Sequence, residues 1–124
     1  MDSAPRRFLL VDDEPALLFS LRNYLTFRGW LVDCSEQIDD ARALARHLRY
    51  DVAIVGISQE NVSQGRSLVR EIRLLHPASR VVALTGSGRS LIEAEGGPFD
   101  VDLVLGRQLP ANEHVGALCN VIVV

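Results

Sequence analysis

The sequence has few of the residues that build disulfides, metal centres or membrane spans. Its 124 residues include two cysteines far apart and in no CxxC or Cys/His cluster, Cys34 and Cys119, which predicts reduced thiols rather than a disulfide. The three histidines lack metal-ligand spacing (His47, His76 and His114). No apolar run approaches the about 20 residues that cross a bilayer, and the start lacks the apolar core of a secretory signal. We therefore expect a cytoplasmic protein.

Phosphate-binding motifs and a strong charge bias are also absent. The chain has no GxGxxG or GxxxxGK[ST] loop, and 13 basic against 16 acidic residues leave a net charge of -3, which favours neither nucleic acid nor a membrane surface. A chain of this length with 48% apolar residues can bury a core without metals or disulfides. We predict one domain over residues 1–124. The apolar end, Val121–Val124, fits either the last turn of a helix or the join to a following output domain.

Short apolar segments that favour β-strands recur along the chain and alternate with helical patterns. The expected strands are Phe8–Val11, Trp30–Val32, Val52–Val55, Val81–Leu84 and Leu103–Leu105. Near-continuous apolarity of this kind is typical of strands that are covered on both faces.

Helical spacing fills the intervals between these strands. The first helix follows the apolar spacing from Leu17 to Arg28, and Gly29 stands where a C-terminal cap is expected. Apolar residues at helical spacing between Ile38 and Leu48 and between Leu68 and Leu75 mark the second and third helices. The fourth is expected over about Arg89–Glu95 and the fifth over about Ala111–Val121. Strands alternating with helices predict an α/β fold with a parallel sheet and helices on both of its faces.

The carboxyl ends of the strands are where such a sheet binds its ligands. The acidic run Asp12–Glu14 follows the first strand, and its adjacent carboxylates repel each other unless a cation offsets them. Thr85 ends the fourth strand, and Arg107, a permanent cation suited to carboxylates, follows the fifth. Gly56 ends the third strand and supplies neither a polar side chain nor a nucleophile.

With these features the chain resembles the receiver domain of two-component response regulators. The matching stretches are Phe8–Pro15, Tyr50–Val55, Gly65–Arg73, Val81–Thr85 and Asp102–Arg107. The resemblance implies a flavodoxin-like three-layer sandwich, with a five-stranded parallel sheet of order 2-1-3-4-5 and five helices. It also implies an acidic pair that helps to hold Mg²⁺, an aspartate that accepts a phosphoryl group, a Ser/Thr and an aromatic residue that report it, and a lysine that contacts it. Asp12, Asp13 and Thr85 match this scheme.

Other positions depart from the family pattern. Gly56 falls at the phosphoacceptor, Val104 at the switch aromatic, Arg107 at the lysine and Gln108 at the proline after it. The expected loop from Ile57 to Gln64 lacks the usual proline, is one residue longer than common and offers no substitute aspartate. Its polar residues are interpreted as turn formers rather than acceptors (Ser58, Glu60, Asn61 and Ser63).

These departures have direct chemical consequences. Glycine has no atom that could attack a phosphoryl group, so Gly56 cannot be an acceptor. Mg²⁺ that has lost one of its few carboxylate ligands should bind at best at about millimolar concentration. Asp12 and Asp13 then need another counter-charge, and we predict a salt bridge to Arg107, worth about 4 kcal/mol before desolvation at an effective dielectric near 20.

The sequence thus predicts a non-enzymatic pseudo-receiver that binds a protein partner without phosphorylation and needs no cofactor, nucleic acid or membrane. The expected partner face is formed by the fourth helix, the fifth strand and the fifth helix, with Leu91 and Ile92 as candidates. A homodimer through the fourth and fifth helices stays open. One alternative is a conventional receiver with a non-standard acceptor or an engineered Gly56. Another is a small nucleotide- or flavin-binding protein on the same fold, although Asp12 and Asp13 would repel an anionic cofactor.

Overall fold

The computed structural model describes residues 6–58, 60–86, 100–107 and 113. Within these ranges strands and helices alternate along the chain. They are β1 (Arg7–Val11), α1 (Pro15–Phe27), β2 (Leu31–Ser35), α2 (Ile38–His47), β3 (Val52–Ile57), α3 (Val62–Leu75), β4 (Arg80–Thr85) and β5 (Leu103–Gly106).

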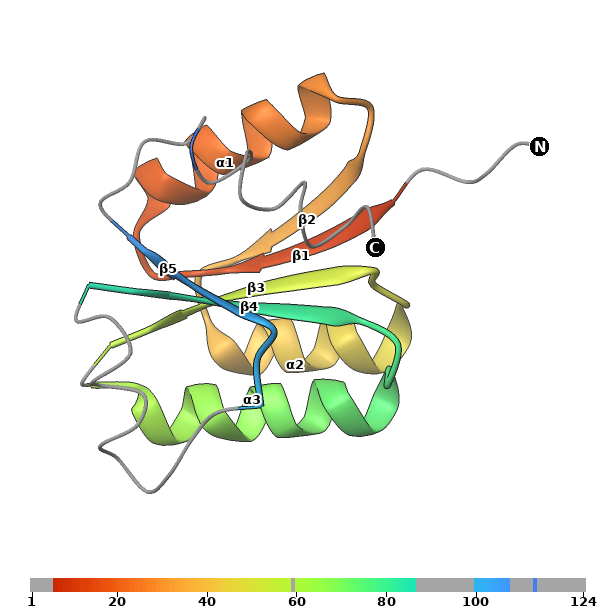
Figure 1. Cartoon of the computed structure of the whole chain (residues 1–124), viewed down its shortest axis with the longest axis vertical. Helices are drawn as coiled ribbons and strands as arrows, with labels where there is room; N and C mark the ends of the chain where they lie inside the picture. Colours follow the sequence, from red (N-terminus) through yellow and green to blue (C-terminus); the bar gives the residue numbers. More distant parts are fainter. Residues whose placement is uncertain (1–5, 59, 87–99, 108–112, 114–124) are drawn as a thin grey trace.

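The strands form one parallel sheet in the order β2-β1-β3-β4-β5, which confirms the predicted topology. Helix α1 covers one face of the sheet, and α2 and α3 lie together on the other (Figure 1). The predicted fourth helix, Arg89–Glu95, lies outside the described residues. So does the predicted fifth, Ala111–Val121, except for Glu113, which is helical.

Alternating side chains of the central strands supply two separate apolar clusters. Phe8 and Leu10 of β1 point to the α1 side, where they pack with residues such as Leu21 and Leu25. Leu9 and Val11 point to the α2–α3 side and join the second cluster there. All six residues of β3 are buried, as expected for a strand covered on both faces.

The end of α1 is a Schellman motif built on Gly29, the position at which the sequence predicted a C-terminal cap. Gly29 has φ 88°, a left-handed conformation that glycine adopts without steric cost. Its N–H donates to the Thr26 oxygen at 2.9 Å, and the Trp30 N–H donates to the Leu25 oxygen at 3.3 Å. The chain therefore turns sharply from α1 into β2.

Two expected boundaries were wrong. Helix α3 begins at Val62, within the loop that was expected to extend from Ile57 to Gln64. The apolar period is broken at Gly65, where a Cβ would lie 2.4 Å from Ile57 Cδ1, because α3 packs closely on β3. Strand β2 extends beyond Val32 to Ser35, and as an edge strand it is mostly only half-buried.

None of the helices in the described ranges is long and apolar enough to cross a lipid bilayer.

Leu25 and Phe27 offer a matched test of this core, because they lie in the same turn of α1 but are 0% and 91% exposed. Leu25→Ala should lower the free energy of unfolding by about 2–5 kcal/mol, since it leaves a cavity under α1. Phe27→Ala should change it by about 0.5 kcal/mol or less. Urea unfolding followed by circular dichroism measures both, and equal losses would contradict this packing.

Candidate functional site

The predicted site residues meet at the carboxyl edge of the sheet. Asp12 follows Val11, which pairs with Val55, so Asp12 lies beside Gly56 across the β1–β3 boundary. Thr85 pairs with Gly106, which places Arg107 just past the end of β4. The parallel sheet therefore brings together side chains that are far apart in sequence.

Asp12 is held in place by β1, β2 and the start of α1. Its main-chain N–H donates to the Ser35 oxygen at 3.1 Å, and the residue is only 4% exposed. Its Oδ1 accepts the Glu14 N–H at 3.0 Å, a local turn that directs the chain into α1. Its Oδ2 is buried and has no hydrogen-bond partner among the described residues.

Gly56 leaves the space that the Asp12 carboxyl fills. A Cβ built on Gly56 would lie 2.1 Å from Asp12 Oδ2 and 2.8 Å from Asp12 Cγ, both far inside van der Waals contact. Any larger residue at position 56 would thus collide with Asp12 in this conformation. The absence of a side chain at Gly56 and the position of Asp12 depend on each other.

Arg107 provides the positive charge of the site, and the predicted salt bridge is present. Its Nη2 donates to Asp12 Oδ1, to Asp13 Oδ1 at 3.3 Å and to Glu14 Oε1 at 3.4 Å. The Arg107 side chain is 23% exposed, against 72% for Asp13 and 57% for Glu14, so Asp12 is the one deeply buried acid of the three. The sequence reasoning missed Glu14 as a third partner, although its place in the acidic run was the available signal.

The electrostatics of Asp12 combine opposing effects. Burial raises the pKa of its carboxyl, while Arg107 and the Glu14 N–H lower it and the neighbouring Asp13 raises it again. The net direction is upward, so the cation offsets only part of the cost of burying the charge. The ion pair is therefore a compensation for burial rather than a net gain in stability.

Thr85 is the last residue of β4, and Val104 lies within β5. Thr85 is fully buried, and its main-chain oxygen accepts the Arg107 N–H at 3.2 Å. Val104 is partly buried and packs against the apolar cluster on the α2–α3 side. Their switch-like roles stay predictions, and Leu91, Ile92 and Gln108 lie outside the described residues.

Asn61 is a structural residue of the site that the sequence reasoning treated only as a turn former. Its Oδ1 accepts the Ser58 N–H at 2.7 Å, and its Nδ2 donates to the Gly56 oxygen at 3.3 Å. It thus ties the loop between β3 and α3 back to the end of β3. Within the described part of the chain, no group of three or more His, Cys, Asp or Glu side chains is arranged to hold a metal ion.

A family model described as the response regulator receiver domain matches residues 8–98. The chain is 26% identical over 113 residues to the photosynthetic apparatus regulatory protein RegA of Rhodobacter capsulatus, covering 91% of this chain and 61% of that protein. It is 28% identical over 115 residues to RegA of Cereibacter sphaeroides, covering 93% and 62%. The chain therefore spans about three fifths of the length of these relatives.

Solved structures show the same fold. A response regulator from Burkholderia pseudomallei, described with a phosphorylated aspartic acid, a calcium ion and citrate, is 25% identical with a TM-score of 0.78, covering 91% of this chain and 66% of that one. The chemotaxis response regulator CheY4 of Vibrio cholerae is 21% identical with a TM-score of 0.82, covering 95% and 99%.

Gly56 and Gly86 give a matched test of the crowding above Gly56, because nothing lies within 4 Å of a Cβ built on Gly86. Gly56→Ala should lower the free energy of unfolding by about 1–3 kcal/mol, since Asp12 must leave its place or strain must accumulate. Gly86→Ala should change it by about 0.5 kcal/mol or less. Chemical denaturation of both variants measures the difference, and equal stability of the two would show that Asp12 does not fill this space.

Arg107→Met tests the ion pair through its pH dependence. The pKa of the Asp12 carboxyl is above its ordinary 3.8 in the folded chain, so the folded state binds this proton more tightly than the unfolded chain does. The contribution of Asp12 to the free energy of unfolding therefore falls as the pH rises from 3.8 through the folded-state pKa. Loss of the cation should raise that pKa further. We expect a loss of about 1–3 kcal/mol in the free energy of unfolding at neutral pH and a much smaller loss in acid, where Asp12 is protonated.

The measurement is urea unfolding of the Arg107→Met variant and the original chain at neutral and acid pH. Asp13→Asn is the control, because Asp13 is 72% exposed and its removal should change stability by about 0.5 kcal/mol or less. A loss of the same size at every pH would mean that Arg107 acts by packing rather than by charge.

Proposed function

The chain belongs to the response regulator receiver domain family of two-component signalling, and we propose that it acts there as a phosphorylation-independent protein-interaction module. The observation that carries this proposal is the pairing of Gly56 with Asp12. The position that the resemblance assigns to the phosphoacceptor has no side chain, and the space above it is filled by the Asp12 carboxyl.

The chemistry of phosphoryl transfer supports this reading. An acyl phosphate forms only when a carboxylate attacks in line, with cations stabilising the phosphoryl oxygens. Gly56 has no attacking atom, and Asp12 Oδ1 is engaged with Arg107 and the Glu14 N–H. The nearby Ser58 holds the loop through its main-chain N–H, which donates to Asn61 Oδ1 at 2.7 Å, so the short loop has a structural role.

The acidic pair does not fit the family's Mg²⁺. Mg²⁺ requires octahedral oxygen ligands, and Gly56 contributes no side-chain oxygen to the set. The Arg107 guanidinium already contacts the carboxylates of Asp12, Asp13 and Glu14, so a permanent cation lies where a divalent ion would have to compete. We infer that the arginine replaces the metal and that millimolar Mg²⁺ leaves the site unchanged.

A receiver whose acidic run is already paired with its own arginine would present one constant surface to its partner. In this proposal the partner is a protein of the signalling pathway, either a separate component or an output domain of the same polypeptide. The relatives are longer than this chain, which is compatible with either arrangement. Recognition through Leu91 and Ile92, and a cytoplasmic location, are parts of the same proposal.

The proposal is tested by exposing the chain to a small phosphodonor with millimolar Mg²⁺ and measuring the intact mass. We expect no addition of HPO₃, because the chain lacks an acceptor at position 56. In parallel, amide NMR shifts at Asp12, Asp13, Gly56, Thr85 and Arg107 are followed during Mg²⁺ titration with and without beryllofluoride. We expect no saturable change.

A receiver that retains the aspartate at the acceptor position serves as positive control for both measurements. Addition of HPO₃ to this chain, located on a loop residue by peptide mapping, would favour the alternative of a non-standard acceptor. Saturable shifts that require beryllofluoride would likewise overturn the proposal, since they would mean that the switch is intact.

A further inference from the structure

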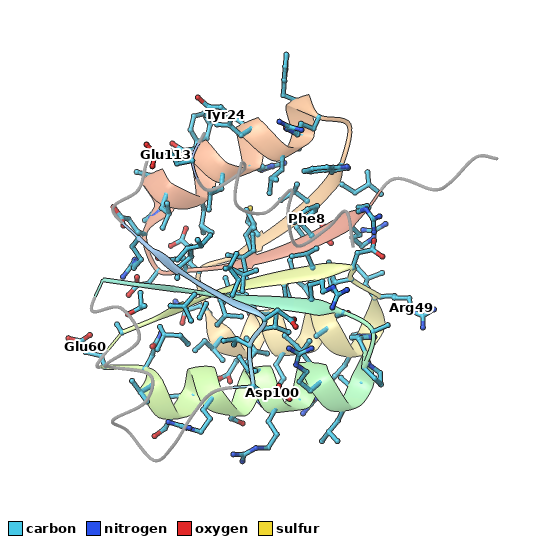
Figure 2. The ribbon with its side chains drawn as sticks, viewed as in Figure 1. Phe8, Tyr24, Arg49, Glu60, Asp100 and Glu113 are labelled. Carbon is cyan, nitrogen blue, oxygen red and sulfur yellow. The ribbon has the colours of Figure 1, made fainter. Side chains whose placement is uncertain are left out.

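The start of β5 is held by one side chain from α3. Arg73, in the last turn of that helix, is 19% exposed, and its Nη2 donates to Asp102 Oδ2 at 2.9 Å. Its Nε donates to the main-chain oxygen of Asp100 at 2.9 Å, and its Nη1 to that of Ser79 at 3.0 Å. Asp100 lies over α3 where the chain leads into β5 (Figure 2). Arg73 thus joins α3, the approach to β4 and the approach to β5.

Asp102 connects Arg73 to the sheet through hydrogen bonds to β4. Its N–H donates to the Val81 oxygen at 2.7 Å, and its Oδ2 accepts the Val81 N–H at 2.7 Å. The carboxylate therefore extends the β4–β5 pairing by one step before the first register pair, Val82 with Leu103. Because the same oxygen accepts from Arg73, a single carboxylate oxygen connects the helix to both strands.

Strand β5 is short and lies at one end of the sheet. It comprises four residues at the end of the sheet order, so among the described strands it forms a ladder only with β4. Just beyond its other end, the Arg107 N–H bonds to Thr85, and the Arg107 guanidinium bonds to Asp12. The strand therefore lies between two charged clamps, one on Arg73 and one on Arg107.

We propose that Arg73 is a positioning residue for the site: by holding the start of β5 through Asp102, it sets the place from which Arg107 reaches Asp12. This inference rests on the proposed function, because a strand clamped at both ends is what a constant, phosphorylation-independent surface requires. The two clamps act as one unit, since a shift of this short strand at one end displaces the other.

The test is native-state hydrogen exchange of the Arg73→Met variant, with the Arg107 amide as the reporter. Loss of the charged hydrogen bonds should lower protection of this amide about tenfold relative to amides of β1 and β3, which report global opening. The matched control is Arg46→Met, because Arg46 Nε pairs with Glu71 Oε2 at 2.5 Å and joins α2 to α3 without contacting β5. In this control the ratio of β5 to β1 protection should stay unchanged.

The double variant Arg73→Met with Arg107→Met shows whether the clamps are coupled. If Arg73 acts through Arg107, its loss should lower protection of the Leu105 amide less in the Arg107→Met background than in the original chain. If Arg73→Met lowers protection of the Leu105 amide by the same factor in both backgrounds, the proposal is overturned. A uniform loss of amide protection over all strands would overturn it as well. Failure here is distinguishable from failure of the proposed function, because phosphorylation is measured on the unmodified chain by intact mass.

Discussion

The rest of the site depends on the ion pair between Asp12 and Arg107. Asp12 is buried at the end of β1, and a buried carboxylate without a nearby cation would be costly. Arg107 supplies that cation from the end of β5, and the two residues meet because β1 and β5 belong to one parallel sheet. The pair therefore joins the carboxyl ends of β1 and β5 by an ion pair.

Two further features follow from this pair. Position 56 must be small, since the Asp12 carboxyl lies where its Cβ would be. The position of β5 also matters to this pair, because Arg107 directly follows the strand and reaches Asp12 from there. In this view Gly56, Arg107 and Arg73 belong to one arrangement around Asp12.

Much of the fold could be predicted because local patterns match it. The strand segments are apolar and short, and Gly29 marks the end of α1 with its positive φ. The first residues of α3 were assigned to the preceding loop because Gly65, which allows the helix to approach Ile57, interrupts the apolar spacing from which helices are recognised. The end of β2 was missed because an edge strand carries polar residues such as Asp33 and Ser35, which look like loop residues in a sequence.

The candidate site divides in the same way. The sequence by itself determined the residue types: an acidic run after the first strand, a glycine where an acceptor is expected, and an arginine in place of a lysine. Only the tertiary structure decided that Asp12 enters the space above Gly56, that Glu14 joins the ion pair, and that Arg73 and Asn61 support the surrounding strands. The physical reason is that these contacts join residues from different strands and helices. Their geometry depends on sheet register and on distances that no local pattern encodes.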